Sequence, residues 1–507
     1  MYRKLNLDRD KVDRCRKAAS RVLAPVFRYI QHHSSVSIER ATLEALGFSG
    51  EKDGVSAADL FVAALSRDQL RFGAANWMLS ASLRMKVSVP ELAKLFLAGK
   101  LDVKKISRYP VQELKPHGER LLRETLETLR LQRRYREQLR LAFPIGKFPH
   151  LQYELSELAS EGCELECKEA ASLGAHIFSI PIQKGQPSLA SLQMQSKVTA
   201  SSSWLKAFRK FLDEEGERRQ KYFRLCVDPS SLCVPEFSLL SAQLGVDVQV
   251  LDPFYAAEQG GLCLKRTLID ASFSAKLLTL AGIHLSSKGD RLFLSQASSS
   301  RLTSQVFVFH VLHELFFQEA GVEADAISVS HRLHLDVDEE DSSLQEIAHA
   351  QVLREFFPRS PVLYFPPHKN ESKLGDWTLA LYHLIALLSE QSVHVLGGKN
   401  DLLAERLLSL KQANVLLKSA KSIGDELSLN TNGKIARRSH MLLENTLKLL
   451  EKLEREGFFE GLQSEKIFSN AISQQSAVGN DGIFQKERTY YNPLMETLSQ
   501  DQASLEK

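Results

Sequence analysis

Short apolar segments alternate with longer segments of helical periodicity through most of the chain after about residue 138. Two of these apolar segments, residues 222–227 and 246–251, each end at an Asp-Pro pair and are followed by a helix-like stretch. A repeated order of strand, loop and helix is typical of a parallel α/β sheet. The same pattern predicts further strands at residues 139–145, 176–180, 283–285, 327–330, 362–365 and 393–396.

About eight strand–helix units follow one another, which predicts a closed (β/α)8 TIM-type barrel over residues 138–425. An open doubly wound sheet is the alternative that the same periodicity allows. Residues 1–137 read as a helical N-terminal accessory region, and residues 426–507 as a C-terminal accessory extension. The helices expected between the barrel strands include residues 150–173, 202–215, 301–320, 343–357, 376–389 and 401–420.

The tail of the C-terminal extension is polar, and it follows an amphipathic helix predicted at residues 439–456. Both a packed clamp and a disordered tail are compatible with its composition. The aromatic pair Tyr490-Tyr491 favours packing.

The composition is that of a globular protein, with 43% hydrophobic and 25% charged residues. No window approaches about 18 uncharged apolar residues, so no membrane span is expected. The chain opens on charged sequence, which predicts no secretory signal and a cytoplasmic location. A net charge of +3 gives no reason to expect nucleic-acid binding.

Two local clusters have alternative interpretations. A basic run at residues 130–140 is better explained by a solvated helix face than by a binding patch. Cys163 and Cys167 have the spacing of two zinc ligands on one helix, but no matching pair is obvious elsewhere, so free thiols are favoured. The six cysteines of the chain are expected to be reduced.

In a barrel, polar residues that follow different strands converge on one face. Lysine, histidine, serine and tyrosine side chains there would suit an anionic substrate or a phosphate. His331 is more simply a structural imidazole and Lys399 an exposed turn residue, whereas Pro366-Pro367 restricts the reach of Lys369. No Walker loop, dinucleotide-binding glycine motif, His-Glu-x-x-His or Asp-x-His-x-x-Gly pattern occurs. The candidates are Ser230, Ser231, Tyr255, Ser286, Ser287, Lys288, His331, His368, Lys369 and Lys399.

Several segments, colinear over almost the whole chain, resemble the α subunit of D-lysine 5,6-aminomutase. None is a catalytic motif alone, but together they are specific. These segments are residues 36–40 (VSIER), 224–226 (RLC), 230–236 (SSLCVPE), 265–270 (KRTLID), 348–361 (AHAQVLREFFPRSP), 364–369 (YFPPHK) and 490–493 (YYNP).

The resemblance implies an isomerase that moves an amino group between adjacent carbons of D-lysine or β-lysine by radical chemistry. It implies pyridoxal 5'-phosphate in the barrel. It also implies adenosylcobalamin bound mainly by a separate β subunit, which supplies the Schiff-base lysine in an α2β2 assembly. By the same resemblance, Ser230 would meet the pyridine nitrogen, Tyr255 would stack on the ring, and Lys369 would contact the substrate carboxylate.

The sequence departs from the family pattern at the two arginines expected to bind the phosphate. The first falls in residues 180–184, where Lys184 is the available cation, and the second falls at Gly260. A lysine lacks the fork geometry of a guanidinium. An alternative function is therefore a catalytically degenerate barrel that serves as a structural or regulatory partner of the β subunit.

Overall fold

The structure is a computed structural model of the chain. It describes residues 5–143, 149–155, 162–182, 192–229, 232–260, 262–287, 300–331, 342–366, 376–396, 402–423, 433–465 and 480–505.

Eight parallel strands form the central sheet, in the order β8-β7-β6-β5-β4-β11-β10-β9. Between the two ends of that order, Ser328 N–H donates to the Leu285 carbonyl at 2.9 Å, and Leu285 and Ile327 form a parallel bridge. This contact closes the sheet, so the barrel prediction is confirmed and the open sheet is wrong. The strands are β4 (His150–Glu154), β5 (Ile177–Ile182), β6 (Arg224–Pro229), β7 (Val248–Val250), β8 (His284–Ser286), β9 (Val329–His331), β10 (Val362–Tyr364) and β11 (Val393–Leu396).

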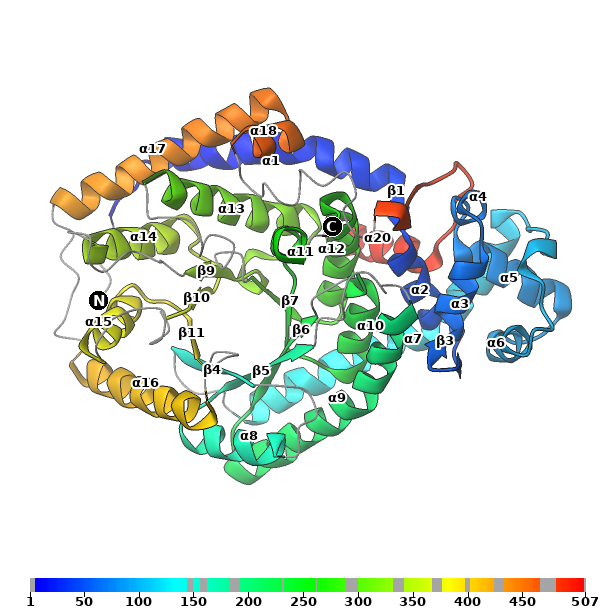
Figure 1. Cartoon of the computed structure of the whole chain (residues 1–507), viewed down its shortest axis with the longest axis horizontal. Helices are drawn as coiled ribbons and strands as arrows, with labels where there is room; N and C mark the ends of the chain where they lie inside the picture. The colour runs from blue at the N-terminus through cyan, green and yellow to red at the C-terminus, as the bar shows by residue number, and fades with distance from the viewer. Residues whose placement is uncertain are drawn as a thin grey trace.

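Helices surround the strands and cover the outer face of the barrel (Figure 1). They pack on outward-facing side chains such as Phe178, Leu225 and Leu285, which are buried in the main hydrophobic core. The helices are α8 (Cys163–Ser172), α9 (Leu192–Arg219), α10 (Val234–Leu244), α11 (Pro253–Gly260), α12 (Leu264–Leu280), α13 (Ser300–Glu319), α14 (Ser342–Phe356), α15 (Asp376–Leu388) and α16 (Leu403–Ile423).

The beginning of the barrel differs from the prediction. The strand expected at residues 139–145 is wrong because α7 (Val111–Ala142) continues as a helix through most of it. The helix expected at 150–173 is also wrong over its first part, since residues 150–154 form β4. The other seven strands and the helices from α13 to α16 lie within a few residues of their predicted positions, whereas α9 begins at Leu192, well before the predicted start at residue 202.

The N-terminal region is largely helical, as predicted. Gly73 adopts φ +91° at the start of α5, which separates two helices in the stretch 57–85. Ser88 caps α6 by accepting from Glu91 N–H at 3.4 Å. Its elements before α7 are α1 (Arg9–His32), β1 (His33–Ser35), α2 (Val36–Ala45), β2 (Glu51–Lys52), β3 (Val55–Ser56), α3 (Ala57–Ala64), α4 (Arg67–Leu70), α5 (Ala74–Met85), α6 (Val89–Leu97) and η1 (Val103–Lys105).

The two ends of the chain pack together against one side of the barrel. α1 lies along α17 (Gly433–Glu456), and both cover α13 (Figure 1). Farther along, β1 pairs antiparallel with β12 (Ile483–Gln485). Tyr491 is 1% exposed, so the described part of the tail packs as a clamp. The remaining C-terminal elements are α18 (Phe458–Ser464), η5 (Asn480–Gly482) and α20 (Pro493–Leu505).

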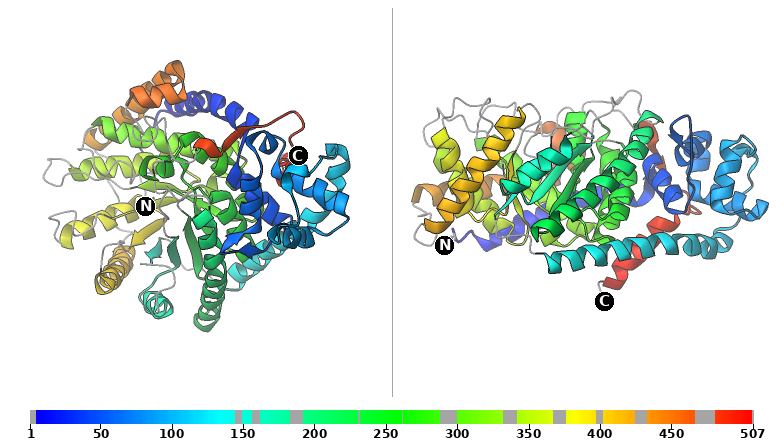
Figure 2. Two further views of the ribbon diagram at one scale, coloured as in Figure 1. Left: turned by 45° about the vertical axis from the view of Figure 1, so that its right-hand side comes forward. Right: turned by 90° about the horizontal axis from the view of Figure 1, so that it is seen from below.

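The basic run on α7 is only partly a solvated face, which corrects the prediction. Arg136 is buried and binds both oxygens of Asp213 on α9, at 2.6 and 2.8 Å. Arg140 binds Asp247 at 3.0 Å. These ion pairs hold α7 across the amino-terminal end of the barrel, where it runs beneath the strands (Figure 2, right).

Candidate functional site at the carboxyl ends of the barrel strands

The interior of the barrel is polar along β4. Successive strand residues point to opposite faces. Tyr153 points outward, because its hydroxyl donates to Glu166 on α8 at 2.8 Å. His150, Gln152 and Glu154 therefore point into the interior, and all three are buried. Glu154 lies nearest the carboxyl end, level with Ser179 of β5.

Apolar side chains also line the interior, beginning on β11 directly beside β4. Leu363 and Phe365 from β10 and Val393 and Val395 from β11 form a small cluster with Ile177, Cys226 and Val250 across the barrel. The interior thus combines this apolar wall with polar side chains, such as Glu154 of β4 and Ser330 of β9. Such a combination suits an organic ligand that carries a few polar groups.

Two buried hydroxyls of the barrel strands have no hydrogen-bond partner among the residues that the structure describes. Ser179 is level with Glu154 and with Cys226, which lies in the interior cluster. Ser330 of β9 is level with Leu363 of the same cluster. The Oγ atoms of both serines are buried and unpaired. Since buried polar groups are normally satisfied, each is available to a bound ligand.

Carboxylates also occur at this end. Glu154 is the last residue of β4, and Asp228 lies near the end of β6. Asp252 lies shortly beyond the end of β7. Asp252 accepts from Ser287 Oγ at 2.8 Å, which links the ends of β7 and β8. Ser287 was among the candidates from the sequence. Acidic groups around a hydroxyl-lined interior provide a setting for a ligand that carries ammonium groups.

The four principal site candidates lie outside the described residues. Lys184, Ser230 and Lys369 are not described, and Tyr255 is described only as a backbone position in α11. In the chain, Lys184, Ser230 and Tyr255 follow β5, β6 and β7, which are neighbours in the sheet. Their assigned roles remain predictions. Of the lesser candidates, Ser231, Lys288, His368 and Lys399 also lie outside the described residues.

His331 is described, and it lies on the other side of the sheet. Its ring is 5.2 Å from that of His349 on α14 and 5.6 Å from that of Tyr364. Gln391 hydrogen bonds to its Nδ1. The residue therefore belongs to the layer between strands and helices, as its structural interpretation predicts.

Sequence reasoning missed the cluster of which His331 is part. Six buried histidines occupy the layer between β9–β11 and α13–α15, around the Tyr364 ring. Burial lowers the pKa of His313 to about 3 and the pKa values of His331 and His383 to about 4. The sequence did contain a signal for this cluster, because these histidines stand among apolar residues in helices and strands. The six are His310, His313, His331, His349, His383 and His394.

The segments that carry the family resemblance meet at a second place, away from the barrel interior. There, Glu39 accepts from Tyr490 hydroxyl at 2.5 Å and from Ala74 N–H at 2.7 Å. Arg40 binds Glu236 of α10 at 2.6 Å. We call this buried contact between the N-terminal region, the C-terminal tail and the barrel the seam.

The seam is charged and buried. Ser35 hydrogen bonds to Asp270 of α12, whose pKa burial raises to about 6. Asn492 donates to Thr42 Oγ1 at 2.8 Å. Burial also raises the pKa of Glu39. Residues from four of the segments that resemble the family thus attach the accessory regions to the barrel. These segments are 36–40, 230–236, 265–270 and 490–493.

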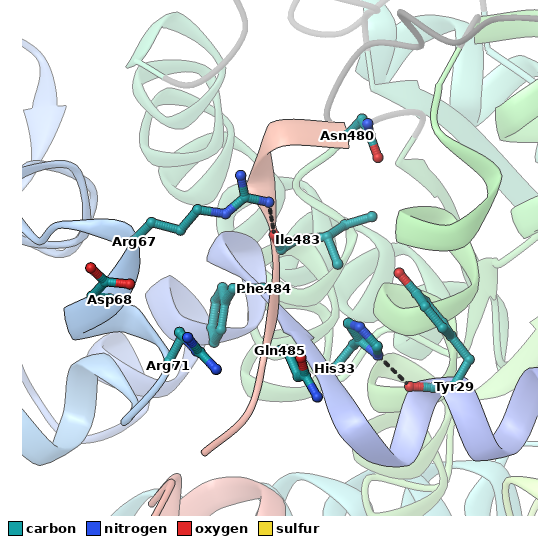
Figure 3. A pocket seen from close by; sticks show the side chains of 9 residues that line it. All are labelled: Tyr29, His33, Arg67, Asp68, Arg71, Asn480, Ile483, Phe484 and Gln485. Carbon is teal, nitrogen blue, oxygen red and sulfur yellow. Dashed lines mark hydrogen bonds between the residues drawn. The ribbon is translucent and has the colours of Figure 1, made fainter.

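A small pocket opens at the edge of the seam, on both sides of β12 (Figure 3). Its volume is about 340 Å³. Arg67 donates to the Ile483 carbonyl at 3.0 Å, and Arg71 pairs with Glu487. Both guanidinium groups are therefore engaged in holding the tail, and the pocket belongs to the seam.

No zinc pair is formed among the described residues. All six cysteines, including Cys163 and Cys167, are buried free thiols. Within the described ranges, no group of three or more histidine, cysteine or acidic side chains is arranged to hold a metal ion. No helix in the same part of the chain is long and apolar enough to cross a membrane.

Comparison with known proteins decides the family. Residues 5–497 match the model described as the D-lysine 5,6-aminomutase TIM-barrel domain of the α subunit. The chain belongs to this family. The chain is 27% identical over 512 residues to the lysine 5,6-aminomutase α subunit of Acetoanaerobium sticklandii, covering 98% of each chain.

A second relative, the lysine 5,6-aminomutase α subunit of Fusobacterium nucleatum, is 25% identical over 510 residues and covers 97% of this chain and 98% of its own. Among solved structures, Yersinia pestis dihydropteroate synthase aligns with 54% of this chain and 94% of its own, at 13% identity and a TM-score of 0.35. The α-subunit relatives span the barrel, the N-terminal region and the tail alike. An α subunit implies a partner subunit.

Proposed function

We propose that this chain is the α subunit of an adenosylcobalamin- and pyridoxal-phosphate-dependent aminomutase acting on D-lysine or β-lysine. The reaction is an isomerisation in which an amino group and a hydrogen exchange places on adjacent carbons. The observation that carries the proposal is that Lys184, Ser230 and Tyr255 follow three neighbouring strands of the barrel. A cofactor held by all three would lie over the carboxyl ends of β5, β6 and β7.

The described interior fits such a cofactor. The unpaired hydroxyls of Ser179 and Ser330 offer hydrogen bonds to polar groups of a ligand. The apolar wall that includes Phe365 and Val395 excludes water from a radical reaction. Pyridoxal phosphate, when bound, would supply the group that carries the migrating nitrogen.

The residues of this chain would bind and orient the cofactor and the substrate. Ser230 would hydrogen bond the pyridine nitrogen, Tyr255 would stack on the ring, and Lys184 would face the phosphate. Lys369 would bind the substrate carboxylate. Glu154 and Asp228 at the strand ends would favour a substrate that carries two ammonium groups, as lysine does.

A separate β subunit would bind adenosylcobalamin and supply the lysine that carries pyridoxal phosphate, in an α2β2 assembly in the cytoplasm. The test is to purify the chain together with a β-type chain that bears a cobalamin motif. Pyridoxal phosphate is titrated by absorbance, and the complex is then assayed with D-lysine and with β-lysine. Conversion of either supports the proposal.

A second function is favoured by Gly260, which stands where the family has a phosphate-binding arginine. Losing a charge-assisted hydrogen bond costs roughly 1.5–3 kcal/mol. A barrel without this anchor would keep the seam and the subunit contact but bind the cofactor poorly. If the two chains associate while pyridoxal phosphate fails to saturate the complex, the degenerate-partner function replaces the aminomutase.

A further inference from the structure

A large cavity lies at the amino-terminal end of the barrel, between α7 and the turns that lead into the strands. Its volume is about 1280 Å³. The turn α12–β8 contributes Gly282 and Ile283, and the turn α13–β9 contributes Val322 and Ala324. The proposed active site is at the carboxyl ends of the strands, so the cavity is at the opposite end of the barrel.

The cavity wall is strongly basic. Among the described residues, five arginines and two glutamates, Glu137 and Glu323, line it. Four of the arginines come from α7 and one from the turn before β10. They are Arg130, Arg133, Arg134, Arg140 and Arg359.

The arginines differ in how firmly they are held. Arg140 is anchored to the buried Asp247 at 3.0 Å. Arg134 is exposed, and its one hydrogen bond goes to the Arg130 carbonyl at 3.4 Å. It has no carboxylate partner in the part of the chain that the structure describes. Arg359 pairs with Glu323 at 3.0 Å, but the two side chains are 61% and 75% exposed.

An exposed pair of this kind contributes little and exchanges readily with other ions. Arg134 and Arg359 can therefore turn to a ligand without the loss of a buried contact. The base of the cavity is apolar, formed by Leu280, Ile283 and Val322. A guanidinium group matches the geometry of phosphate oxygens, and an apolar base accommodates a hydrophobic ring.

We propose that this cavity binds an organic polyphosphate, with its phosphates on Arg134 and Arg359 and its organic body on Leu280, Ile283 and Val322. The site is independent of the proposed aminomutase function, because it shares no residue with the strand ends. α7 bridges the barrel and the N-terminal region, so a ligand here also contacts the helix that joins the two.

The test is isothermal titration calorimetry of the full-length chain with ATP and with inorganic tripolyphosphate. We expect one saturable ATP site per chain. Replacing both exposed arginines, Arg134→Gln with Arg359→Gln, should weaken ATP binding at least tenfold. Tripolyphosphate should bind more weakly than ATP, because it leaves the apolar base uncovered.

The matched control is the pair Arg14→Gln with Arg218→Gln, which removes the same charge from exposed helix positions away from the cavity. It should leave ATP binding unchanged. Saturating pyridoxal phosphate should also leave it unchanged, which separates this site from the proposed cofactor site. The proposal is overturned if ATP does not saturate at millimolar concentration, or if both double variants weaken binding equally.

Discussion

Arg40 Nε donates to Glu236 Oε1 at 2.6 Å, and the two side chains are 3% and 0% exposed. The contact joins α2 of the N-terminal region to α10 of the barrel. Glu236 also accepts from Ser37 Oγ, and Arg40 lies 3.3 Å from Asp59. One arginine thus balances two buried carboxylates. The attachment of the N-terminal region to the barrel depends on this balance.

Arg40→Ala should destabilise the protein by about 3–5 kcal/mol, because it leaves Glu236 buried without its counter-charge. Urea denaturation followed by circular dichroism measures the change. The double variant Arg40→Met with Glu236→Leu should recover part of the loss, since no unpaired charge remains.

The control for Arg40 is Arg21→Ala, which breaks the exposed pair with Glu454, where the arginine side chain is 59% exposed. It should change stability little, because exposed ion pairs are screened by water. Equal effects of the two substitutions would show that the Arg40 pair is not what attaches the two regions.

Tyr490→Phe should destabilise the protein by about 1–3 kcal/mol, because it removes the hydroxyl that donates to the buried Glu39. Thermal denaturation gives the shift. The neighbouring Tyr491→Phe serves as control, because its hydroxyl makes only a 3.5 Å contact to the Lys115 carbonyl. If both tyrosines gave the same small effect, the Glu39 hydrogen bond would not stabilise the tail.

Most of the barrel could be predicted from sequence because short apolar runs between helical segments mark most of its strands. β4 is the exception. Its inward positions His150, Gln152 and Glu154 are polar, since they line the interior, so the apolar run that marks the other strands is absent. Residues 139–142 (LRLA) mimic a strand by alternation, but they form the last turn of α7, where Leu141 is 87% exposed.

The candidate site was only partly predictable. The rule that polar residues follow parallel strands singled out Ser286 and Ser287, both of which are buried at the end of β8. It did not single out Ser179 and Ser330, because a serine inside an apolar strand looks like a tolerated small residue. The seam could not be located from sequence at all, because its residues are brought together from segments more than 400 residues apart.

Gly245→Ala should destabilise the protein by more than Gly99→Ala. Both glycines have a left-handed backbone, with φ +67° and +70°, so both pay a conformational cost of roughly 1–2 kcal/mol. A Cβ at Gly99 meets nothing within 4 Å, whereas one at Gly245 lies 2.7 Å from Arg136 Nε. Urea denaturation compares the two. Equal losses would mean that Arg136 moves aside without strain.

Tyr255→Ala should weaken pyridoxal phosphate binding roughly tenfold in the two-chain complex, because stacking on an aromatic ring contributes about 0.5–1.5 kcal/mol beyond burial. Tyr255→Phe keeps the ring and should have little effect. Absorbance titration measures both. If Tyr255 only packs, Tyr255→Ala will lower thermal stability while the cofactor affinity is unchanged.

Lys369→Ala should leave cofactor affinity unchanged and raise KM for the amino-acid substrate, because its proposed partner is the substrate carboxylate. Lys369→Arg should restore part of the substrate affinity, since the charge is kept. Steady-state kinetics of the two-chain complex, together with the same absorbance titration, test this. A variant that behaves like the wild type in both measurements would identify Lys369 as a solvated loop lysine.

The six buried histidines make the fold sensitive to acid. Burial lowers the pKa of His331 and His383 from 6.5 to about 4. Below pH 6.5 the unfolded chain therefore binds protons that the folded chain excludes, and stability falls until the folded pKa is reached. Each histidine contributes about 1.4 kcal/mol per pH unit in this range.

Buried carboxyl groups modify this acid dependence, because burial raises the pKa of Glu39 and Asp59 as well as that of Asp270. Asp270, whose folded pKa is raised to about 6, acts in the opposite direction, because its folded form is protonated first as the pH falls. Glu346 lies 3.3 Å from His331 Nε2 and would favour a charged imidazole there. These carboxyl groups do not offset the six histidines, whose effect is reinforced by His176 and His284 with pKa values that burial lowers to about 4. The net slope should therefore remain positive between about pH 4 and 6.5.

His313→Leu is the sharpest test of this acid dependence. Neither ring nitrogen of His313 has a hydrogen-bond partner, and the ring packs 4.9 Å from that of Phe317. Leucine should therefore preserve stability near neutral pH, and it should reduce the loss at about pH 5 by roughly 2 kcal/mol. Urea denaturation at the two pH values measures the difference. His32→Leu, at an exposed position, should leave the loss unchanged, and an equal gain from both variants would place the acid sensitivity outside the buried histidines.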